Sequence, residues 1–393
     1  MMTGNLILYG QLEMISFFFC FLLSLFSSGL ANDTNSSIVS SSIQVNAHAS
    51  GNIVLKLDSL FQVLSAKRGF NGNVLIAQGG KVIYENAFGY ADLKEKTPLN
   101  IESTFQLASI TKQFTAMAIM MLHDEGKLNF TDTLQRFFPR FPYHNITIRQ
   151  LLTHRSGLPE YMSFAKRYWK NKKHLMNNDD VMDMLITKHP GLVFVPDRKY
   201  TYNNTGYAIL ACIVEQVSGL QFHIFLEKRI FKPLGMKRTF IYNTKNMLDN
   251  EYYTLGYKKN RCRAEEDYLS GVVGDKGIYS TVEDMFKWDQ ALYTEQLIKQ
   301  TTLQEAYTPF SYNWRKDNSY GYGWRITTAE DSSKIVYHAG LWRGYSSLFV
   351  RRLHDKTTII VLCNKVNWSF ENIDRFMGIL DSAKHGVSSS GGD

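Results

Sequence analysis

The chain has 393 residues, of which 44% are hydrophobic and 20% charged, and this composition is typical of a folded globular protein rather than a disordered or fibrous one. Its formal net charge is +8, but the densest basic run, Lys170–Lys173, is too short to predict a nucleic-acid-binding surface. The four cysteines form no C-x-x-C pattern, so the sequence does not support a structural zinc site or a thioredoxin-like motif, and we expect no metal or other cofactor.

The first 50 residues contain the one long apolar run near the N-terminus, residues 15–26, followed by the small residues Gly29 and Ala31. A helix that spans the bilayer needs about 20 apolar residues, and this run is shorter than that. We therefore predict a secretory signal peptide over residues 1–31 and an exported, periplasmic or extracellular protein. Residues 1–14 contain no Lys or Arg, and an uncleaved membrane anchor at residues 15–26 is therefore the alternative. Residues 32–50 are small and polar, which predicts a flexible tether.

Strand patterns follow the tether, and then a helix. Residues 73–78 and 81–92 are β-like runs separated by Gly79-Gly80, which predicts a hairpin. From Ser109 the apolar residues recur at helical spacing, and the helix should end near Gly126.

Helical patterns fill the middle of the chain, from about 130 to 240, including an apolar stretch at 208–218 that ends at Gly219. Strand patterns return at 334–338, 345–351 and 357–363, and a closing helix is expected at 371–380. Strands at both ends predict an α/β (α+β) fold in which one antiparallel sheet joins the two ends, flanked by helices. The helical middle would be an inserted all-helical domain, with the active site in the cleft between the two.

An S-x-x-K pattern begins the first long helix, at Ser109 and Lys112. Residues i and i+3 of a helix are neighbours, and the first turn favours negative charge on a serine oxygen. A second match, Ser163 and Lys166, lies in an aromatic, charged stretch without a preceding strand. The first pair is the better candidate for a nucleophile and its base.

Two more triplets lie at the edges of predicted elements. Tyr202-Asn203-Asn204 precedes the apolar helix, and His338-Ala339-Gly340 ends a strand-like run. A phenol has a pKa of about 10 and is a poor base near neutral pH unless a cation such as Lys112 lowers it. Asn204 could bind a substrate amide, and a glycine at a strand edge allows a ligand to approach the backbone.

The three motifs occur along the chain in the order S-x-x-K, Y-x-N and H-x-G. With them, the chain resembles the serine β-lactamase and penicillin-binding-protein superfamily. It is most similar to the branch of class C β-lactamases, D,D-carboxypeptidases, D-amino-acid peptidases and esterases. The stretches 151–159, 274–284 and 340–345 share in this resemblance, which extends from about Val54 to Leu380. It implies a catalytic domain over residues 51–385 with a β-lactamase/transpeptidase-like fold, and it leaves residues 386–393 as a flexible tail. His154, Lys276 and Asp284 are interpreted as structural.

The resemblance implies acyl transfer through a covalent intermediate, with Ser109 as the nucleophile. Lys112 and Tyr202 would handle the proton as a coupled pair, with Tyr202 as the expected base. Asn204 and His338 would bind substrate, and the oxyanion hole would be formed by the backbone N–H groups of Ser109 and Leu341, the latter next to Gly340.

Because His338 stands where relatives with K-T-G have a permanently charged lysine, its charge depends on pH, and the substrate is left open. We expect a small-molecule or peptide substrate, such as a D-amino-acid peptide, with β-lactams and carboxylic esters as alternatives, and no nucleic-acid partner. A further alternative is a penicillin-binding sensor that is acylated and does not turn over.

Overall fold

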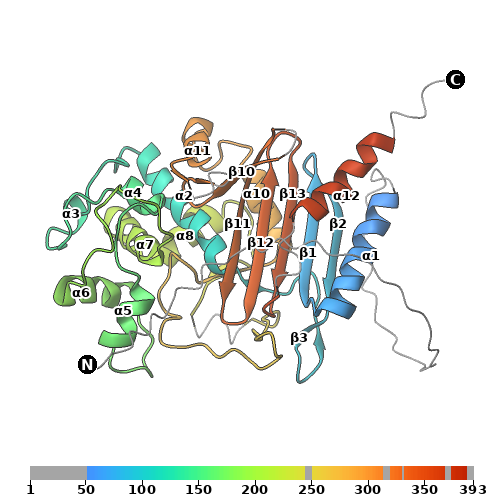
Figure 1. Ribbon diagram of the computed structural model, residues 1–393, viewed down its shortest axis with the longest axis horizontal. Coiled ribbons are helices and arrows are strands. Elements are labelled where there is room, and N and C mark those ends of the chain that lie inside the picture. The colour runs from blue at the N-terminus through green and yellow to red at the C-terminus, as the bar shows by residue number, and fades with distance from the viewer. Residues whose placement is uncertain (1–50, 244–249, 313–318, 330–331, 368–372, 387–393) are drawn as a thin grey trace, which may run out of the picture. The chain divides into compact units, whose positions relative to one another are not determined.

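An eight-stranded antiparallel sheet forms the centre of the computed structural model, in the order β2-β1-β13-β12-β11-β10-β9-β8 (Figure 1). The model describes residues 51–243, 250–312, 319–329, 332–367 and 373–386, all within one unit of residues 41–393. The predicted signal peptide or anchor, the tether and nearly all of the C-terminal tail lie outside the described residues. The strands are β1 (Gly72–Gln78), β2 (Lys81–Phe88), β8 (Ser311–Tyr312), β9 (Ser319–Tyr320), β10 (Arg325–Thr328), β11 (Lys334–Trp342), β12 (Tyr345–Arg352) and β13 (Thr357–Cys363).

The two ends of the chain meet in this sheet. Strand β1 pairs with β13, with Gly72 opposite Cys363 and Ala77 opposite Thr358, although almost 300 residues separate the two strands. The predicted joining of the early and late strands is confirmed. The early hairpin and the three late strands also lie where the sequence predicts them, and β11 extends four residues further than expected.

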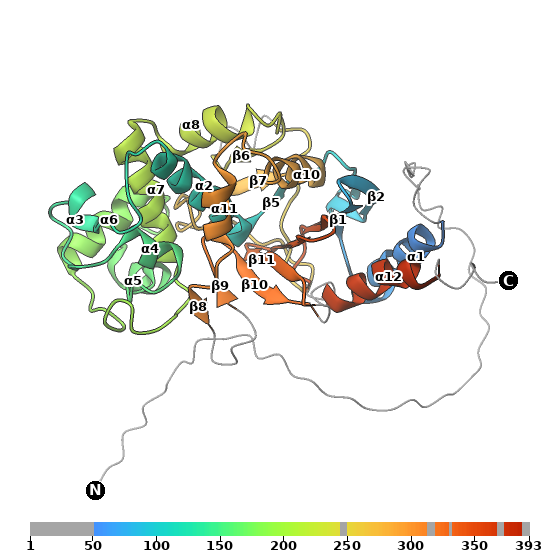
Figure 2. The ribbon, with the colours of Figure 1, turned by 90° about the horizontal axis from the view of Figure 1, so that it is seen from above.

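Both faces of the central strands are buried, because alternate side chains of a strand point to opposite faces. In β13, Ile359 and Val361 pack in the same cluster as residues of α1 (Gly51–Arg68) and α12 (Ile373–Gly386). The intervening Ile360 and Leu362 belong to a larger cluster that includes α2 (Thr111–Asp124) and α10 (Val282–Ala291). Figure 2 shows α1 and α12 on one side of the sheet and α10 on the other.

The remaining helices lie between β5 and β11, mostly in the predicted helical middle (Figure 1). They are α3 (Leu134–Phe137), α4 (Ile148–Leu152), α5 (Tyr161–Tyr168), α6 (Asn178–Lys188), α7 (Asn204–Ser218), α8 (Phe222–Leu226), η2 (Glu227–Phe231) and α11 (Gln300–Ala306). Two small sheets complete the fold, one of β3 (Tyr90–Asp92) and β4 (Thr97–Pro98), the other of β5 (Phe105–Gln106), β6 (Phe240–Ile241) and β7 (Ile278–Ser280).

Helix α7 shows how the local sequence sets the boundaries of an element. Asn203 caps its first turn by accepting a hydrogen bond from Gly206 N at 2.9 Å. Gly219 ends it with φ of 69°, a left-handed conformation that costs glycine little. The predicted stop at Gly219 is therefore confirmed, and the cap fixes the residues just before the helix.

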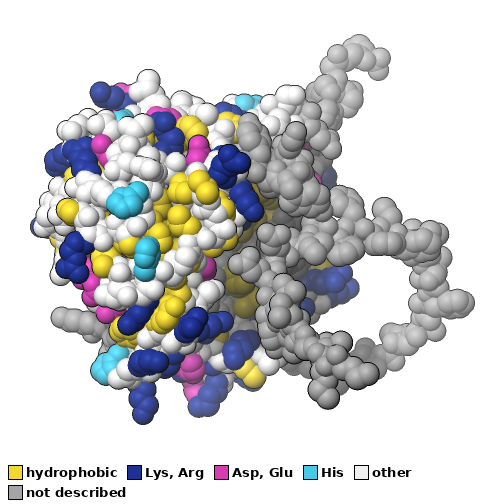
Figure 3. Space-filling model, turned by 60° about the vertical axis from the view of Figure 1, so that its left-hand side comes forward, with side chains coloured by type: hydrophobic (Ala, Val, Ile, Leu, Met, Phe, Trp, Pro, Cys, Tyr) yellow, Lys and Arg dark blue, Asp and Glu magenta, His cyan; other side chains and the backbone are white. Residues whose placement is uncertain are grey.

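The surface of the helical side carries Lys and Arg side chains dispersed around an area of hydrophobic ones (Figure 3). Among the exposed large hydrophobic residues of the chain, Val193 and Val195 in the connection between α6 and α7 are 63% and 67% exposed. Within the described residues no single helix has both the length and the apolar character needed to cross a membrane. One bent pair of helices, Asn204–Ser218 and Phe222–Phe231, reaches that length and apolar character only when the two are taken together.

Candidate active site

Ser109 lies in a short helical turn, η1 (Ala108–Ile110), between strand β5 and helix α2. Ala108 directly before it has φ of 48°, in the left-handed region that L-residues with a Cβ seldom adopt. Such strain persists only where the surrounding structure enforces it, and it is concentrated at functional sites. The turn leaves the Ser109 side chain partly exposed, while the neighbouring Ile110 is fully buried.

Lys112 lies one turn further along and is completely buried. Its Nζ donates to Ser109 Oγ at 3.2 Å, to Asn204 Oδ1 at 2.8 Å and to the backbone carbonyl of Asp275 at 2.9 Å. Burial lowers the pKa of Lys112 to about 8, against the opposing effects of the acidic Asp275 and Glu160. This amine can therefore lose a proton close to neutral pH while it remains within hydrogen-bond distance of the serine.

Tyr202 packs beneath the lysine, whose Nζ lies 4.9 Å from the centre of the Tyr202 ring. The phenol oxygen is buried and makes no hydrogen bond of ordinary geometry within the described residues, although the Ser109 side chain is near enough to lower its pKa. Burial is the larger effect, and it raises the pKa of Tyr202 well above its usual value. The Ser109 hydroxyl and the charge of Arg325 lower this pKa, but desolvation outweighs both in the free protein, so the role of Tyr202 as the base stays a prediction.

Asn204 begins helix α7 and connects the lysine to an acid that the sequence analysis does not identify. Its Oδ1 accepts from Lys112, and its backbone N and Nδ2 donate to Glu160 Oε2 at 2.9 and 3.3 Å. Both ends of the Asn204 amide are thus engaged in the free protein. A substrate amide would have to share or replace one of these hydrogen bonds.

His338 lies in β11 and is 1% exposed. Its ring centre is 6.1 Å from that of Tyr202, and its Nε2 forms a hydrogen bond of 3.0 Å with the hydroxyl of Tyr320. Burial, and then the positive charges of Arg325 and Lys112, lower the pKa of His338 well below its usual value. Burial therefore favours the neutral form of His338 in the free protein, and a positive charge to pair with a substrate carboxylate is costly at this position.

Gly340 and Leu341 follow His338 where the edge of β11 becomes open. Strand β10 pairs with β11 only as far as Tyr337, so the backbone from His338 to Trp342 has no β10 partner. A Cβ on Gly340 would collide with the carbonyl oxygen of Leu107. Glycine here allows β11 to pack against the turn that carries Ser109, rather than leaving space for a ligand as the sequence suggested. Leu341, 48% exposed, is adjacent to that contact.

Arg325 is a functional candidate that the sequence analysis does not include. It lies in β10 opposite Tyr337 and Tyr320, and its guanidinium carbon is 5.5 Å from the centre of the Tyr202 ring. The side chain is partly exposed, and no acidic residue of the described chain forms an ion pair with it. No sequence motif marks an arginine 13 positions before the histidine, so only pairing of the strands reveals it.

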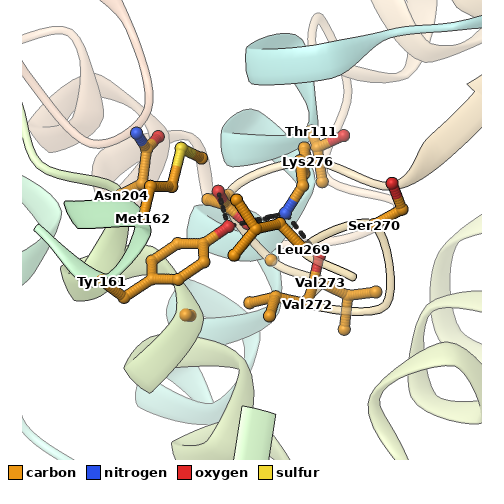
Figure 4. A network of polar contacts seen from close by, with 12 residues as sticks. Thr111, Tyr161, Met162, Asn204, Leu269, Ser270, Val272, Val273 and Lys276 are labelled. Atoms are coloured by element: carbon orange, nitrogen blue, oxygen red, sulfur yellow. Dashed lines mark hydrogen bonds and ion pairs between the residues drawn. The ribbon is translucent and has the colours of Figure 1, made fainter. Parts of the chain in front are cut away.

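A second buried lysine, Lys276, belongs to a network of polar contacts next to the site (Figure 4). Lys276 donates to the hydroxyl of Tyr161 at 2.6 Å and pairs with the Asp275 carboxylate at 3.5 Å, and Tyr161 in turn donates to that carboxylate at 3.0 Å. Asp275 supplies the carbonyl that accepts from Lys112. Lys276, interpreted as structural, therefore holds the segment that positions the reactive lysine.

The fold brings all seven predicted site residues together, and it leaves the second S-x-x-K pair elsewhere. Ser163 and Lys166 are both exposed on α5 and make no contact with the site. His154, expected to be structural, accepts from the backbone N of Asn203 at 3.1 Å and packs against the Tyr202 ring at 4.3 Å. Within the described ranges no group of three or more His, Cys, Asp and Glu side chains could hold a metal ion.

A model of the Beta-lactamase family matches residues 57–384. Penicillin-binding protein 4* of Bacillus subtilis (strain 168) is 37% identical over 342 residues, which cover 84% of this chain and 75% of the relative. The D-aminopeptidase of Brucella anthropi is 24% identical over 328 residues, covering 82% of this chain and 61% of the relative.

Solved structures show the same similarity. The penicillin binding protein from Bacillus halodurans superposes with a TM-score of 0.71 at 27% identity, over 82% of this chain and 98% of that one. The D-amino acid amidase from Ochrobactrum anthropi SV3, complexed with L-phenylalanine, has a TM-score of 0.69 at 23% identity, over 84% of this chain and 99% of that one. The latter supports the fold alone.

Proposed function

Since this chain belongs to the beta-lactamase family and is a serine hydrolase of that family, we propose that it cleaves peptides or related amides that end in a D-amino acid with a free carboxylate. The observation that carries the proposal is Arg325, a partly exposed cation beside Tyr202 and His338 without an acidic partner in the described chain. A carboxylate prefers a guanidinium because of its fixed, two-pronged donor geometry. His338 is less suited to this role, because burial favours its neutral form.

Ser109 is the proposed nucleophile and Lys112 the proposed base. The three acceptors around Lys112 suit an ammonium ion. When the ammonium loses one proton, the amine can keep its bonds to Asn204 and Asp275 and accept the hydroxyl proton of Ser109. The serine oxygen then attacks the substrate carbonyl carbon, and the backbone N–H groups of Ser109 and Leu341 are the proposed donors to the developing oxyanion.

Tyr202 is the proposed acid for the leaving group. Its phenol is neutral because burial raises its pKa, so it can donate a proton to the leaving nitrogen as the C–N bond breaks. The phenolate recovers a proton from the Lys112 ammonium, which returns both groups to their starting states. Water then hydrolyses the ester on Ser109 by the same route in reverse.

The relatives support an amide substrate of D-configuration, since they are named as penicillin-binding proteins and as D-aminopeptidases. The first alternative function is that of a β-lactamase or carboxylesterase. The second alternative is a penicillin-binding sensor that is acylated and does not turn over. Each alternative predicts a different pattern of acylation across a penicillin, a D-Ala-D-Ala peptide and a short acyl ester.

The test combines intact-protein mass spectrometry after exposure to this panel with turnover of a matched substrate pair, an N-acylated D-Ala-D-Ala peptide and its C-terminal carboxamide. The wild-type protein should turn over the free acid in preference to the carboxamide. Arg325→Gln should remove the preference by raising KM for the acid alone, by roughly tenfold or more for one lost charge-assisted contact. Ser109→Ala should abolish acylation and turnover, whereas Ser163→Ala, the matched serine on α5, should behave as the wild type.

A wild-type protein that prefers the carboxamide or the ester, or an Arg325→Gln variant that keeps its preference for the acid, would contradict the proposed substrate. Acylation by penicillin with neither peptide turnover nor release would favour the sensor.

We also propose that the protein is exported, with the apolar residues 15–26 acting as a signal or anchor. Expression in a bacterial host, followed by fractionation and N-terminal sequencing of the recovered protein, tests this. A mature N-terminus near residue 32 supports cleavage, a membrane-bound intact chain supports the anchor, and intact protein in the cytoplasm contradicts export.

A further inference from the structure

A pocket of about 600 Å³ lies at the end of the sheet where β1 begins and β2 and β13 end. No residue of the candidate active site lines it. Its walls come from four separate segments: the link from α1 to β1, the hairpin of β3 and β4, the loop of residues 255–263, and Lys365 just after β13. The volume is within the range of pockets that bind small ligands, which is about 300–1,000 Å³.

Positive charge dominates the lining of this pocket. Five cationic side chains line it, and Asp92 is the one acidic residue among its lining. The cations are Lys94, Lys96, Arg261, Arg263 and Lys365. Such an excess of one sign in a concave site raises the local concentration of counter-ions.

Asp92 offsets one of these five positive charges, and its carboxylate is also held in place by hydrogen bonds. Its Oδ1 accepts from the backbone N of Lys94 at 2.7 Å, from the backbone N of Glu95 at 3.2 Å and from the hydroxyl of Tyr257 at 3.1 Å. Tyr257 also accepts from the backbone N of Leu93 at 2.9 Å. These contacts fix the β3–β4 hairpin against the 255–263 loop and give the pocket a defined wall.

Three of the cations have no acidic partner among the described residues: Lys96, Arg261 and Lys365. Lys365 is partly buried and donates to the backbone carbonyl of Gly69 at 3.3 Å. Burial lowers the pKa of Lys365, and the nearby charge of Arg261 lowers it further. Lys365 and Arg261 therefore repel one another, and an anion bound in the pocket stabilises both charges.

The backbone at two of these positions would favour a different residue. Lys96 has φ of 54° and Arg261 has φ of 68°, conformations in which glycine or asparagine costs less. Turn geometry therefore does not explain the long cationic side chains at these positions.

We propose that this pocket binds a small oligoanion that carries two or more phosphate groups. Lys96, Arg261 and Lys365 offer donors suited to several phosphate oxygens at once. Lys94 and Arg263 pair with Glu95 and Glu265 at 3.1 and 3.3 Å. The pocket is large enough to hold two linked phosphates together with their contacts. The site is independent of the proposed hydrolase activity.

The test is isothermal titration calorimetry of the full protein with inorganic phosphate, pyrophosphate and citrate at low and at matched higher ionic strength. Pyrophosphate should bind more tightly than either of the others, and added salt should weaken its binding. Arg261→Gln and Lys96→Gln, both at exposed positions, should each raise the dissociation constant by roughly tenfold, the effect of one lost charge-assisted hydrogen bond. The double variant Lys170→Gln/Lys173→Gln removes two exposed lysines elsewhere and should bind as the wild type does.

Arg325→Gln is the decisive control, because it removes the cation of the candidate active site. Pyrophosphate binding that is lost in Arg325→Gln and kept in Arg261→Gln would overturn the proposal, as would a failure of the wild type to bind pyrophosphate. Equal binding of citrate and pyrophosphate would also refute the proposed class of ligand. Turnover of the peptide substrate should be unchanged in Lys96→Gln and Arg261→Gln, which shows that these variants fold.

Discussion

Lys112 combines two properties that rarely occur in one side chain, complete burial and contact with a partly exposed hydroxyl. Its three acceptors hold the ammonium in place, while the loss of water around it makes that charge costly. The balance leaves its pKa at about 8 rather than at the usual 10.4 of a lysine. A residue in this state can exchange a proton with Ser109 within the pH range of most enzymes.

The pH dependence of hydrolysis follows from the lowered pKa of Lys112. Below pH 8 Lys112 is mainly protonated and cannot accept a proton from Ser109, so kcat/KM should rise with pH and level off above about 8. Tyr202→Phe should lower the rate and keep this inflection, whereas Lys112→Met should remove both activity and inflection. The pH–rate profiles of the wild type and the Tyr202→Phe variant check this.

Lys166→Met, a change at the exposed lysine of the other S-x-x-K pair, is the matched control and should leave the profile unchanged. A wild-type rate that is independent of pH from 6 to 9 would exclude Lys112 as the base. An inflection that disappears in Tyr202→Phe while substantial activity remains would point to the phenol instead.

Gly340 is a second site residue whose role follows from its close surroundings: an added Cβ would meet the Leu107 carbonyl oxygen, the Ser347 Oγ and the Ala108 Cβ. Alanine there would place its Cβ against the backbone carbonyl of Leu107, which cannot move without displacing Ala108 and Ser109. We expect Gly340→Ala to fold with reduced stability and to lose at least tenfold in kcat/KM, since small displacements of catalytic groups carry large costs. Steady-state kinetics together with thermal unfolding check this prediction. Gly378→Ala, in α12 with open space around its Cα, serves as the control.

At the scale of elements, strand β12 is fixed to helix α10 by a buried ion pair. Arg351 and Asp289 are both inaccessible to solvent, and Nε lies 2.5 Å from Oδ1. Thr358 of β13 donates to the other carboxylate oxygen at 2.8 Å, and Tyr307 accepts from Arg351. Four elements or connections thus meet at one charged cluster behind the sheet.

Asp289→Asn should destabilise the protein by about 3–5 kcal/mol, because it leaves the charge of Arg351 buried without a counter-charge. Asp197→Asn is the matched control: that carboxylate pairs with Arg155 at the surface and is 65% exposed, so its loss should cost about 1 kcal/mol or less. Urea unfolding of the two variants measures both values. Equal effects in the two variants would show that burial does not determine the strength of the pair.

At the scale of the whole molecule, the helical middle and the sheet share a core. The larger hydrophobic cluster contains Phe114 of α2 and Ile213 of α7 together with Phe349 and Ile360 of the sheet. The sheet itself closes only when the first and the last strands pair. Neither half can bury its apolar surface without the other, and non-local pairing of this kind must form before the sheet is complete.

The described unit should therefore unfold in one cooperative transition. Thermal unfolding followed by far-UV circular dichroism, which reports mainly on the helices, should coincide with unfolding followed by tryptophan fluorescence, since Trp288 and Trp324 lie in the shared core. Two separated transitions would mean that the helical middle is an independent domain.

Several features could be predicted from the sequence because they depend on neighbouring residues. The β-branched and apolar run of β13, the glycine stop of α7 and the S-x-x-K spacing are local patterns, and a physical rule connects each of them to structure. The order of the elements was enough to predict that the two ends join in one sheet. Helix α1 was not predicted, although its buried face packs with α12 on the sheet.

The sequence by itself determined most of the elements, the fold class and the residues Ser109, Lys112, Tyr202 and His338 as candidates. Only the tertiary structure decided which protonation state Lys112, Tyr202 and His338 favour, because a pKa depends on burial and on charges that come from distant segments. It also decided that Arg325 and Glu160 join them, since strand pairing and a helix cap bring these two residues to the site from positions without any motif. Local patterns are encoded in neighbouring residues, whereas desolvation and charge are properties of the assembled core.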